Sequence, residues 1–181
     1  MQNPYLPLIS FLAFGTLVMQ VVSVAALLVY LTTFFVKQKS PITKLANFVG
    51  KHGILLGFLI VSLATISSLF LSEVAGFPPC RYCWFQRILM YPQVVVLGVA
   101  YFLNDLKARL TALILSIIGL LVATYHILVQ FFPGQFKCSD EAASCALKQI
   151  SYFGYITIPV MSATAFIAII VLMLYSLRKS K

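Results

Sequence analysis

The sequence predicts an all-α integral membrane protein that crosses the bilayer five times. The chain of 181 residues is 61% hydrophobic and only 9% charged, whereas about a quarter of the residues in a soluble domain are charged. The apolar residues are gathered into five continuous runs, and a helix needs roughly 20 such residues to cross the hydrocarbon core. Continuous runs favour helices over the strands of a membrane barrel, which alternate apolar and polar residues.

The five runs, in chain order, are Tyr5–Val36, Ile54–Ser72, Trp84–Leu103, Leu110–Phe132 and Ile156–Leu177. The first has no basic segment before it and is about twice as long as the apolar region of a signal peptide, so we expect a retained, tilted helix. We divide the chain into this additional N-terminal transmembrane helix, residues 1–40, and a four-helix bundle with two cysteine-bearing outer loops, residues 41–181. The connections are too short for a soluble domain, so the function is expected in the bundle and its loops.

The distribution of basic residues predicts the orientation in the membrane. Lysine and arginine gather in the first connection, the third connection and the C-terminal tail, which lie on one side if five helices alternate. Because these residues mark the cytoplasmic side, we expect the N-terminus outside and the C-terminus in the cytoplasm. The net charge of +9 is therefore a topology signal, and no nucleic-acid partner is expected.

All four cysteines then fall outside the cytoplasm, where disulfides form and persist. Cys80 and Cys83 lie between the second and third runs, and Cys138 and Cys145 lie between the last two. Two close pairs suggest two dithiol/disulfide couples, although four cysteines allow three pairings. Because loop-closure stabilisation grows with loop length, neither short loop gains much from a structural disulfide. Redox chemistry is the favoured interpretation.

Other uses of the cysteines stay open. A zinc site made of all four would make the protein a non-enzymatic membrane scaffold, but zinc sites commonly have a close cysteine pair at each end, and six residues separate the second pair. Haem attachment requires a histidine where Trp84 stands. The interpretation as a transporter is disfavoured by the lack of paired charges within the runs. We therefore predict no metal.

Cys83 marks the start of the third helix, because Pro78 and Pro79 end the preceding one. A helix N-terminus carries about half a positive charge and favours a thiolate, so Cys83 is the expected thiolate. Arg87 lies four residues further, one turn deeper on the same face. An arginine within the membrane suggests function, the alternative being a side chain that snorkels to the interface.

His126 is the other ionisable side chain within a run. Its depth differs from that of Arg87 by about 3 Å, at roughly 1.5 Å per residue, so a shared pocket is expected. A thiolate, a guanidinium and an imidazole in apolar surroundings suit a lipid-soluble quinone. Arg87 and His126 would hydrogen-bond its oxygens, with Gln86 assisting. An interhelical hydrogen bond is the alternative role for His126.

The stretches PCRYCWFQRILMYP and YHILVQ, with the second cysteine pair between the last two runs, resemble the DsbB family of membrane disulfide oxidoreductases, in its BdbC form. The resemblance covers about residues 44 to 177. It implies a four-helix bundle in the bacterial plasma membrane that reoxidises a thioredoxin-like, DsbA-type thiol oxidase. It also implies that the electrons pass to a quinone, either ubiquinone or menaquinone, and that the protein thereby supports disulfide formation in exported proteins.

The resemblance also implies a role for each cysteine. Cys138 and Cys145 form the disulfide that the reduced partner attacks, with the mixed disulfide at Cys138. Electrons then pass to Cys80 and Cys83 by thiol–disulfide exchange, and Cys83, beside Arg87, reacts with the quinone. A vitamin K epoxide reductase-like enzyme is the rival, but in that family the loop pair precedes the Cys-x-x-Cys, and here it follows.

Two features depart from the simplest family pattern. The chain has the additional N-terminal run, and the second cysteine pair is closely spaced. The short spacing leaves little slack, so either the loop moves as a unit or the four cysteines already lie near one another. The apolar residues from Ala143 to Phe153 fall roughly on one helical face, which favours a short surface helix over a loop anchored by aromatic residues.

Overall fold

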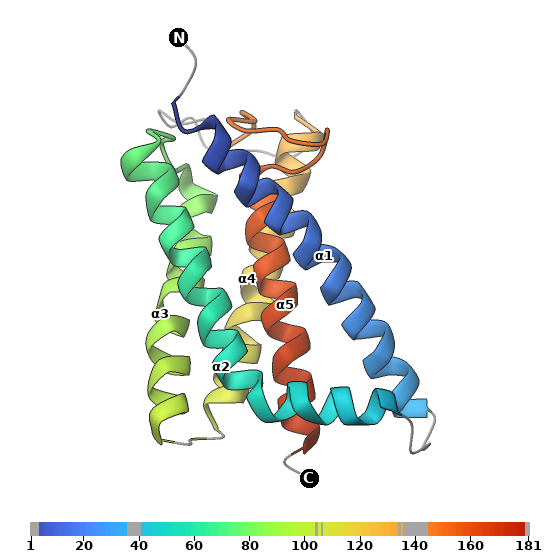
Figure 1. The fold of residues 1–181 in the computed structure, drawn as a ribbon. Coiled ribbons are helices and arrows are strands. Elements are labelled where there is room, and N and C mark those ends of the chain that lie inside the picture. The colour runs from blue at the N-terminus through green and yellow to red at the C-terminus, as the bar shows by residue number, and fades with distance from the viewer. Residues whose placement is uncertain are drawn as a thin grey trace.

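The computed structural model describes residues 4–35, 41–103, 105, 107–133, 135 and 145–179. Its helices are α1 (Leu6–Phe35), α2 (Pro41–Leu69), α3 (Arg81–Leu103), α4 (Ala108–Phe131) and α5 (Ile158–Lys179), and the π-helical turn η1 (Phe70–Val74) extends α2 (Figure 1). Among these described residues, five helices are long and apolar enough to cross a membrane. The predicted all-α architecture with five spans is therefore confirmed.

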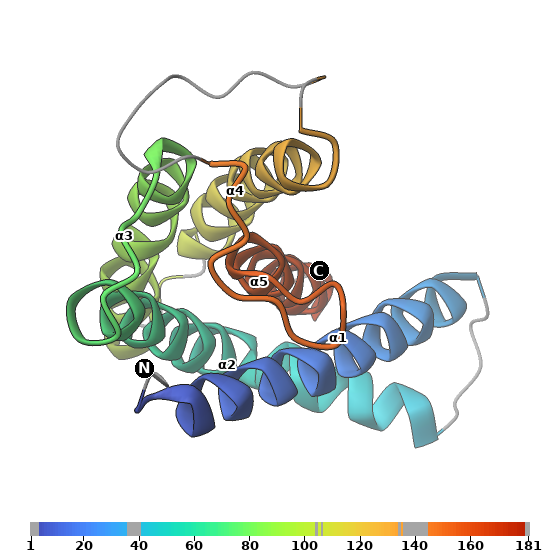
Figure 2. The ribbon, with the colours of Figure 1, turned by 90° about the horizontal axis from the view of Figure 1, so that it is seen from above.

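Helices α2 to α5 form a bundle in which α2 packs on α3 and α5, and α4 packs on α3 and α5 (Figure 2). Helix α5 is central, with 67% of its apolar window buried, against 11% for α1. The α4–α5 contact is close because Gly119 has no side chain. The ring of Phe166, which is fully buried, occupies the space that a Cβ at Gly119 would take.

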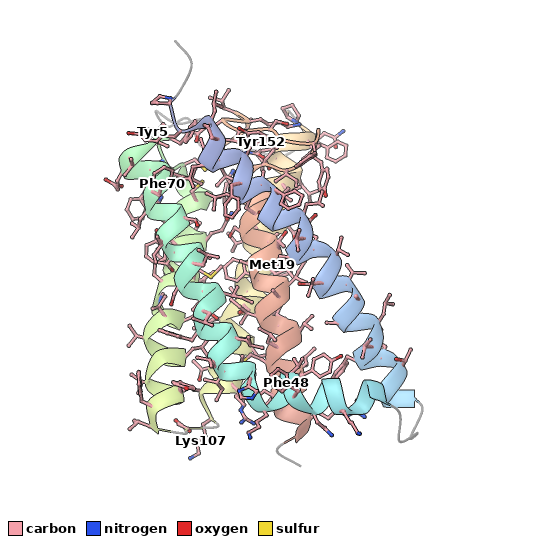
Figure 3. All side chains as sticks on the ribbon, in the orientation of Figure 1. Tyr5, Met19, Phe48, Phe70, Lys107 and Tyr152 are labelled. Atoms are coloured by element: carbon pink, nitrogen blue, oxygen red, sulfur yellow. The ribbon has the colours of Figure 1, made fainter. Side chains whose placement is uncertain are left out.

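The first turn of α1 and the last turn of α5 lie at opposite ends of the bundle, as five alternating spans require (Figure 1). Tyr5 and Tyr152 mark the end that holds the second cysteine loop, and Lys107 marks the other end (Figure 3). Which of these ends faces the cytoplasm stays a prediction, based on the basic residues near the Lys107 end.

The segment that follows Cys145 is a loop, so the favoured surface helix is wrong for its described part. Tyr152 and Ile156 exchange backbone hydrogen bonds of 3.0 and 2.9 Å across a tight turn. Phe153 and Gly154 at its tip have φ angles of 52° and 78°, and a right-handed helix needs negative φ. This segment is instead the alternative that the sequence left open, a loop that carries aromatic residues. Residues 136–144 lie outside the described part of the chain.

Candidate active site

The Cys-x-x-Cys pair is placed by a sharp break between α2 and α3. After η1, Gly76 adopts a φ of 75°, which glycine reaches without a steric penalty, and two prolines lead to α3. The backbone N–H of Trp84 donates to the carbonyl of Cys80 at 3.1 Å, so Cys80 occupies the N-cap position. Cys83 lies within the first turn.

The two sulfurs share this helix N-terminus. Both cysteines are free, and the Cys80 and Cys83 Sγ atoms are 3.4 Å apart. A hydrogen bond from the Cys83 thiol, followed by a hydrogen bond from His126, lowers the pKa of Cys80 from 9.0 to about 4, although burial opposes this. Negative charge is therefore favoured on Cys80, whereas the sequence suggested Cys83. The main reason is the hydrogen bond from the Cys83 thiol, and the N-cap position adds a smaller contribution, because the Cys80 side chain also accepts from the backbone N–H of Cys83.

His126 on α4 is fully buried against the same pair. Its Nδ1 lies 3.1 Å from the Gln86 amide nitrogen, which can only donate, so Nδ1 accepts and the ring proton lies on Nε2. Nε2 is 3.5 Å from Cys80 Sγ and 3.3 Å from the Cys145 carbonyl oxygen. The imidazole N–H therefore faces both the Cys80 sulfur and the second cysteine loop.

Cys145 completes a compact group of sulfur residues. It is buried and packs with Cys80 and Val129, with Cys83 at the edge of the cluster. Cys145 is disulfide-bonded, and Cys138 lies outside the described residues. The short spacing left open whether the loop moves as a unit or the cysteines already lie near one another. For Cys145 the structure shows the second arrangement, because it packs against Cys80.

Arg87 is held inside the bundle instead of reaching for the interface. Its side chain is 8% exposed. Its Nε donates to Ser68 Oγ at 3.1 Å and its Nη2 to the Ser68 carbonyl at 2.9 Å. The Tyr91 hydroxyl donates to the same Ser68 Oγ at 3.3 Å, and the guanidinium carbon lies 5.4 Å from the centre of the Trp84 ring. Ser68 and Tyr91 therefore orient the buried charge.

A cavity of about 240 Å³ opens beside this cluster, between α1, α2, α3 and α5. Its walls are mostly apolar, and α3 contributes Cys83, Gln86 and Arg87. One thiol and one guanidinium in an apolar space fit a quinone, which needs apolar contact for its ring and a hydrogen-bond donor for an oxygen. Gln86 and Arg87 line the same cavity as Cys83, and their contact with a quinone stays a prediction.

His126 lies on the other side of the cysteine pair. It lines a smaller cavity together with Cys80, Cys83 and Cys145. Its contacts there are with a sulfur and a loop carbonyl, and it is not among the residues that line the larger cavity. The hydrogen bond from His126 to a quinone that the sequence suggested stays a prediction. Cys83 is the sulfur common to both cavities.

The same cluster has the composition of a metal site. The ligand atoms of Cys80, Cys83 and His126 all lie within 4.8 Å of one another, and zinc binds cysteine and histidine. No histidine lies in the outer loops that carry the cysteines, and the histidine of this cluster comes instead from within a span.

Comparison with known proteins identifies the family. The profile of the family described as "Disulfide bond formation protein DsbB" matches residues 50–176. The chain belongs to the DsbB family. It is 46% identical over 120 residues to a "Probable disulfide formation protein" of Oceanobacillus iheyensis, which covers 65% of this chain and 83% of the relative. It is 40% identical over 118 residues to "Disulfide bond formation protein C" of Bacillus subtilis, covering 64% of this chain and 86% of the relative. No solved structure matches the chain.

The DsbB match includes the whole cluster. Cys80, Cys83, Arg87 and His126 all lie within it, and so does Cys145. The resemblance seen in the sequence is thereby confirmed. Helix α1 ends before the match begins, so the additional helix lies outside the part shared with the DsbB profile.

Proposed function

We propose that this DsbB-family protein is a membrane thiol:quinone oxidoreductase. It reoxidises a DsbA-like thiol oxidase outside the cytoplasm, passes the electrons to a membrane quinone, and thereby supports disulfide formation in exported proteins. The observation that supports this most is the continuous path of reactive groups. Cys145 adjoins Cys80, Cys80 contacts Cys83, and Cys83 lines the apolar cavity that Arg87 also lines.

The first stage exchanges disulfides with the partner. A partner thiolate attacks the disulfide that Cys145 forms, which we assign to Cys138, and the mixed disulfide forms at Cys138. The partner's second thiolate then displaces Cys138, so the partner leaves with a disulfide and two electrons and two protons stay on Cys138 and Cys145. A second exchange passes them to the Cys80–Cys83 disulfide and restores the first one.

The second stage discharges the Cys80–Cys83 dithiol. A bound quinone would supply a two-electron, two-proton acceptor; the Cys83 thiol gives one of the protons and surrounding water gives the other, because Cys80 is already a thiolate. Cys83 faces the acceptor, and its disulfide with Cys80 re-forms as the electron pair leaves. His126 holds its Nε2 atom 3.5 Å from the Cys80 sulfur, and the Nε2–H group stabilises the thiolate there. Arg87 offers its positive charge to the acceptor's oxygen, oriented by Ser68.

The energetic requirement supports a strong acceptor. A DsbA-like oxidase has a reduction potential near −120 mV, well above that of glutathione pools. A respiratory quinone can keep such a partner oxidised. The free Cys80 and Cys83 together with a disulfide-bonded Cys145 correspond to the state that is ready to discharge electrons into the cavity.

The test is a reconstituted reaction. Purified protein is mixed with a reduced DsbA-like protein and a soluble quinone, and the loss of quinone absorbance is followed. The wild type and Val95→Ala, at a lipid-facing residue that is 66% exposed, should turn over, whereas Cys83→Ser and Cys145→Ser should not. Turnover that survives both cysteine substitutions would contradict the relay.

A metal-binding scaffold is the second candidate, favoured by the three converging ligands Cys80, Cys83 and His126. It predicts about one zinc ion per purified chain, loss of that zinc in His126→Ala, and no quinone reduction. The oxidoreductase predicts quinone reduction that a chelator leaves unchanged.

A further inference from the structure

The additional helix α1 lies outside the DsbB match, yet it forms one wall of the large cavity. We propose that α1 binds the isoprenoid chain of the quinone, so that this protein prefers quinones with a polyprenyl tail over tailless ones. The proposal rests on the proposed function for the identity of the ligand and assigns a role to the additional helix.

One face of α1 lines the cavity. The residues concerned are Phe11, Leu12, Gly15, Thr16 and Met19. They recur at helical spacing and extend over about 12 Å of the helix, at roughly 1.5 Å per residue. Met19 lies near the middle of the bundle in Figure 3, away from the end that holds the cysteine loop. The α1 wall of the cavity therefore continues inward along the membrane-spanning part of the helix. An acyl or isoprenoid chain bound in the cavity could extend along this wall.

The charged and the redox-active groups of the cavity come from α3 and not from α1. The thiol of Cys83 and the guanidinium of Arg87 are on α3, and the remaining polar lining comes mainly from serines of α2 and α5, whereas α1 contributes apolar side chains, one glycine and Thr16. The Thr16 hydroxyl donates to the Leu12 carbonyl of its own helix at 2.8 Å. Because α1 turns mainly hydrocarbon to the cavity, its natural contact is the apolar part of the ligand and not the quinone oxygens.

Helix α1 is fixed to the bundle by polar contacts. Gln20 donates to Thr164 Oγ1 at 3.1 Å and accepts from the Tyr155 hydroxyl at 2.7 Å. The Tyr175 hydroxyl donates to the Ala26 carbonyl at 2.7 Å. Hydrogen-bonding side chains within a span commonly hold helices together. The wall is therefore a fixed part of the fold and can present a defined surface to a ligand.

Gly15 gives a direct way to fill the cavity. A Cβ at Gly15 would meet no atom within 4 Å, so a side chain there has room to extend. Gly15→Phe should occupy the α1 side of the cavity and leave Arg87 and the dithiol untouched. Val22→Phe is the matched control, because Val22 on the same helix is 60% exposed and lies outside the cavity lining.

Binding can be measured without turnover, because Trp84 is the single tryptophan of the chain and adjoins Arg87. Quenching of its fluorescence is titrated with menadione, which has no tail, and with a menaquinone that carries a polyprenyl tail on the same ring. The corresponding pair of tailless and tailed benzoquinones is run in parallel.

We expect the wild type to bind the tailed quinone at least about tenfold more tightly, since the tail gains apolar contact. Gly15→Phe should remove about tenfold of that affinity and change the affinity for the tailless quinone less than about twofold. Val22→Phe should match the wild type. If Gly15→Phe does not insert stably, Met19→Ala tests the same wall by removing contact, with an expected loss of about threefold for the tailed quinone alone.

Equal affinity of the wild type for both quinones, or an equal loss for both in the α1 variants, would overturn the proposal. The two hypotheses fail separately. A protein that prefers tailed quinone but never oxidises a DsbA-like partner would retain the α1 site and lose the proposed function. A protein that turns over without any tail preference would retain the function and lose the α1 site.

Discussion

The cause of the lowered pKa of Cys80 can be tested by one substitution. The hydrogen bond from the Cys83 thiol is the largest cause of the lowering, and His126 contributes next. Cys83→Ala removes the first cause and keeps the second. We expect the pKa of Cys80 in this variant to rise from about 4 towards 9.0. Cys83→Ser keeps a hydroxyl donor and should preserve most of the lowering.

The lowered pKa changes the ionised fraction of Cys80 at neutral pH by a large amount. A thiol with a pKa of 9.0 is ionised to only ~1% at pH 7, whereas a pKa of about 4 leaves it ~99.9% ionised. The lower basicity also weakens the nucleophile, because reactivity falls with a Brønsted coefficient of about 0.4–0.5. The alkylation rate at one pH therefore discriminates poorly, and the pH dependence of ionisation is the informative quantity.

The assay follows thiolate absorbance in the ultraviolet during a titration from acidic to mildly alkaline pH. It uses the reduced protein in a Cys138→Ser, Cys145→Ser background, so that Cys80 and Cys83 are the only thiols. One thiolate per chain should form near pH 4, and absorbance should then stay level to pH 8. Tyrosines ionise near pH 10 and do not interfere.

A single transition with a midpoint between pH 8 and 9 in the parent protein would refute the argument, because it would mean that neither thiol is stabilised as a thiolate. A low midpoint that Cys83→Ala leaves unchanged would refute the assignment of the cause to Cys83.

Further predictions concern Arg87, helix packing and topology. Ser68→Ala should raise the KM for quinone by about 2- to 10-fold with little change in kcat, because the hydrogen bond from Arg87 Nε to Ser68 Oγ is lost at ~0.5–1.5 kcal/mol, while the bond to the Ser68 backbone carbonyl remains; an unchanged KM would show that the Ser68 hydroxyl does not position Arg87. Gly119→Ala should destabilise the α4–α5 contact by about 1–3 kcal/mol through overpacking against Phe166, seen as a lower Tm, whereas Gly15→Ala, where a Cβ meets open space, should keep the wild-type Tm. In a cysteine-free background, a membrane-impermeant maleimide added to intact cells should label Ser151→Cys and not Lys107→Cys, and the reverse pattern would invert the proposed orientation.

The five spans could be predicted because a helix buried in lipid requires a long apolar run. The helix boundaries could not, because they depend on capping residues and on turns that lie outside the apolar runs. Helix α2 begins at Pro41, well before the apolar run that starts at Ile54, because its first turns lie across the end of the bundle before the helix rises (Figure 1). Helix α3 begins at Arg81, earlier than the apolar run, because Cys80 caps it.

The site was predictable in its residues and less so in its geometry. Arg87 followed from its spacing to Cys83 along one helix. His126 matches Arg87 in depth, but depth does not determine which side of a helix faces the dithiol, and packing turns His126 towards Cys80. Ser68 carries no sequence signal for its contact with Arg87, because that contact joins two helices. Tyr91, four residues after Arg87, could have been found from the shared helix face.

The role of α1 could not be read from its sequence, because an apolar helix has the same composition whether it faces lipid or a cavity. Gln20 was the available signal, since a polar side chain within a span usually marks a helix contact. The structure gives that contact as Thr164 and Tyr155.

The central claim is that the Cys80–Cys83 dithiol delivers its electrons to a quinone. A single-turnover experiment tests it most directly. Reduced protein carrying Cys138→Ser and Cys145→Ser is mixed anaerobically with a small excess of quinone, and quinone absorbance and free thiols are counted together. The account predicts that one quinone is consumed per chain as two thiols disappear into a Cys80–Cys83 disulfide. Thiols that persist beside unreduced quinone would contradict it.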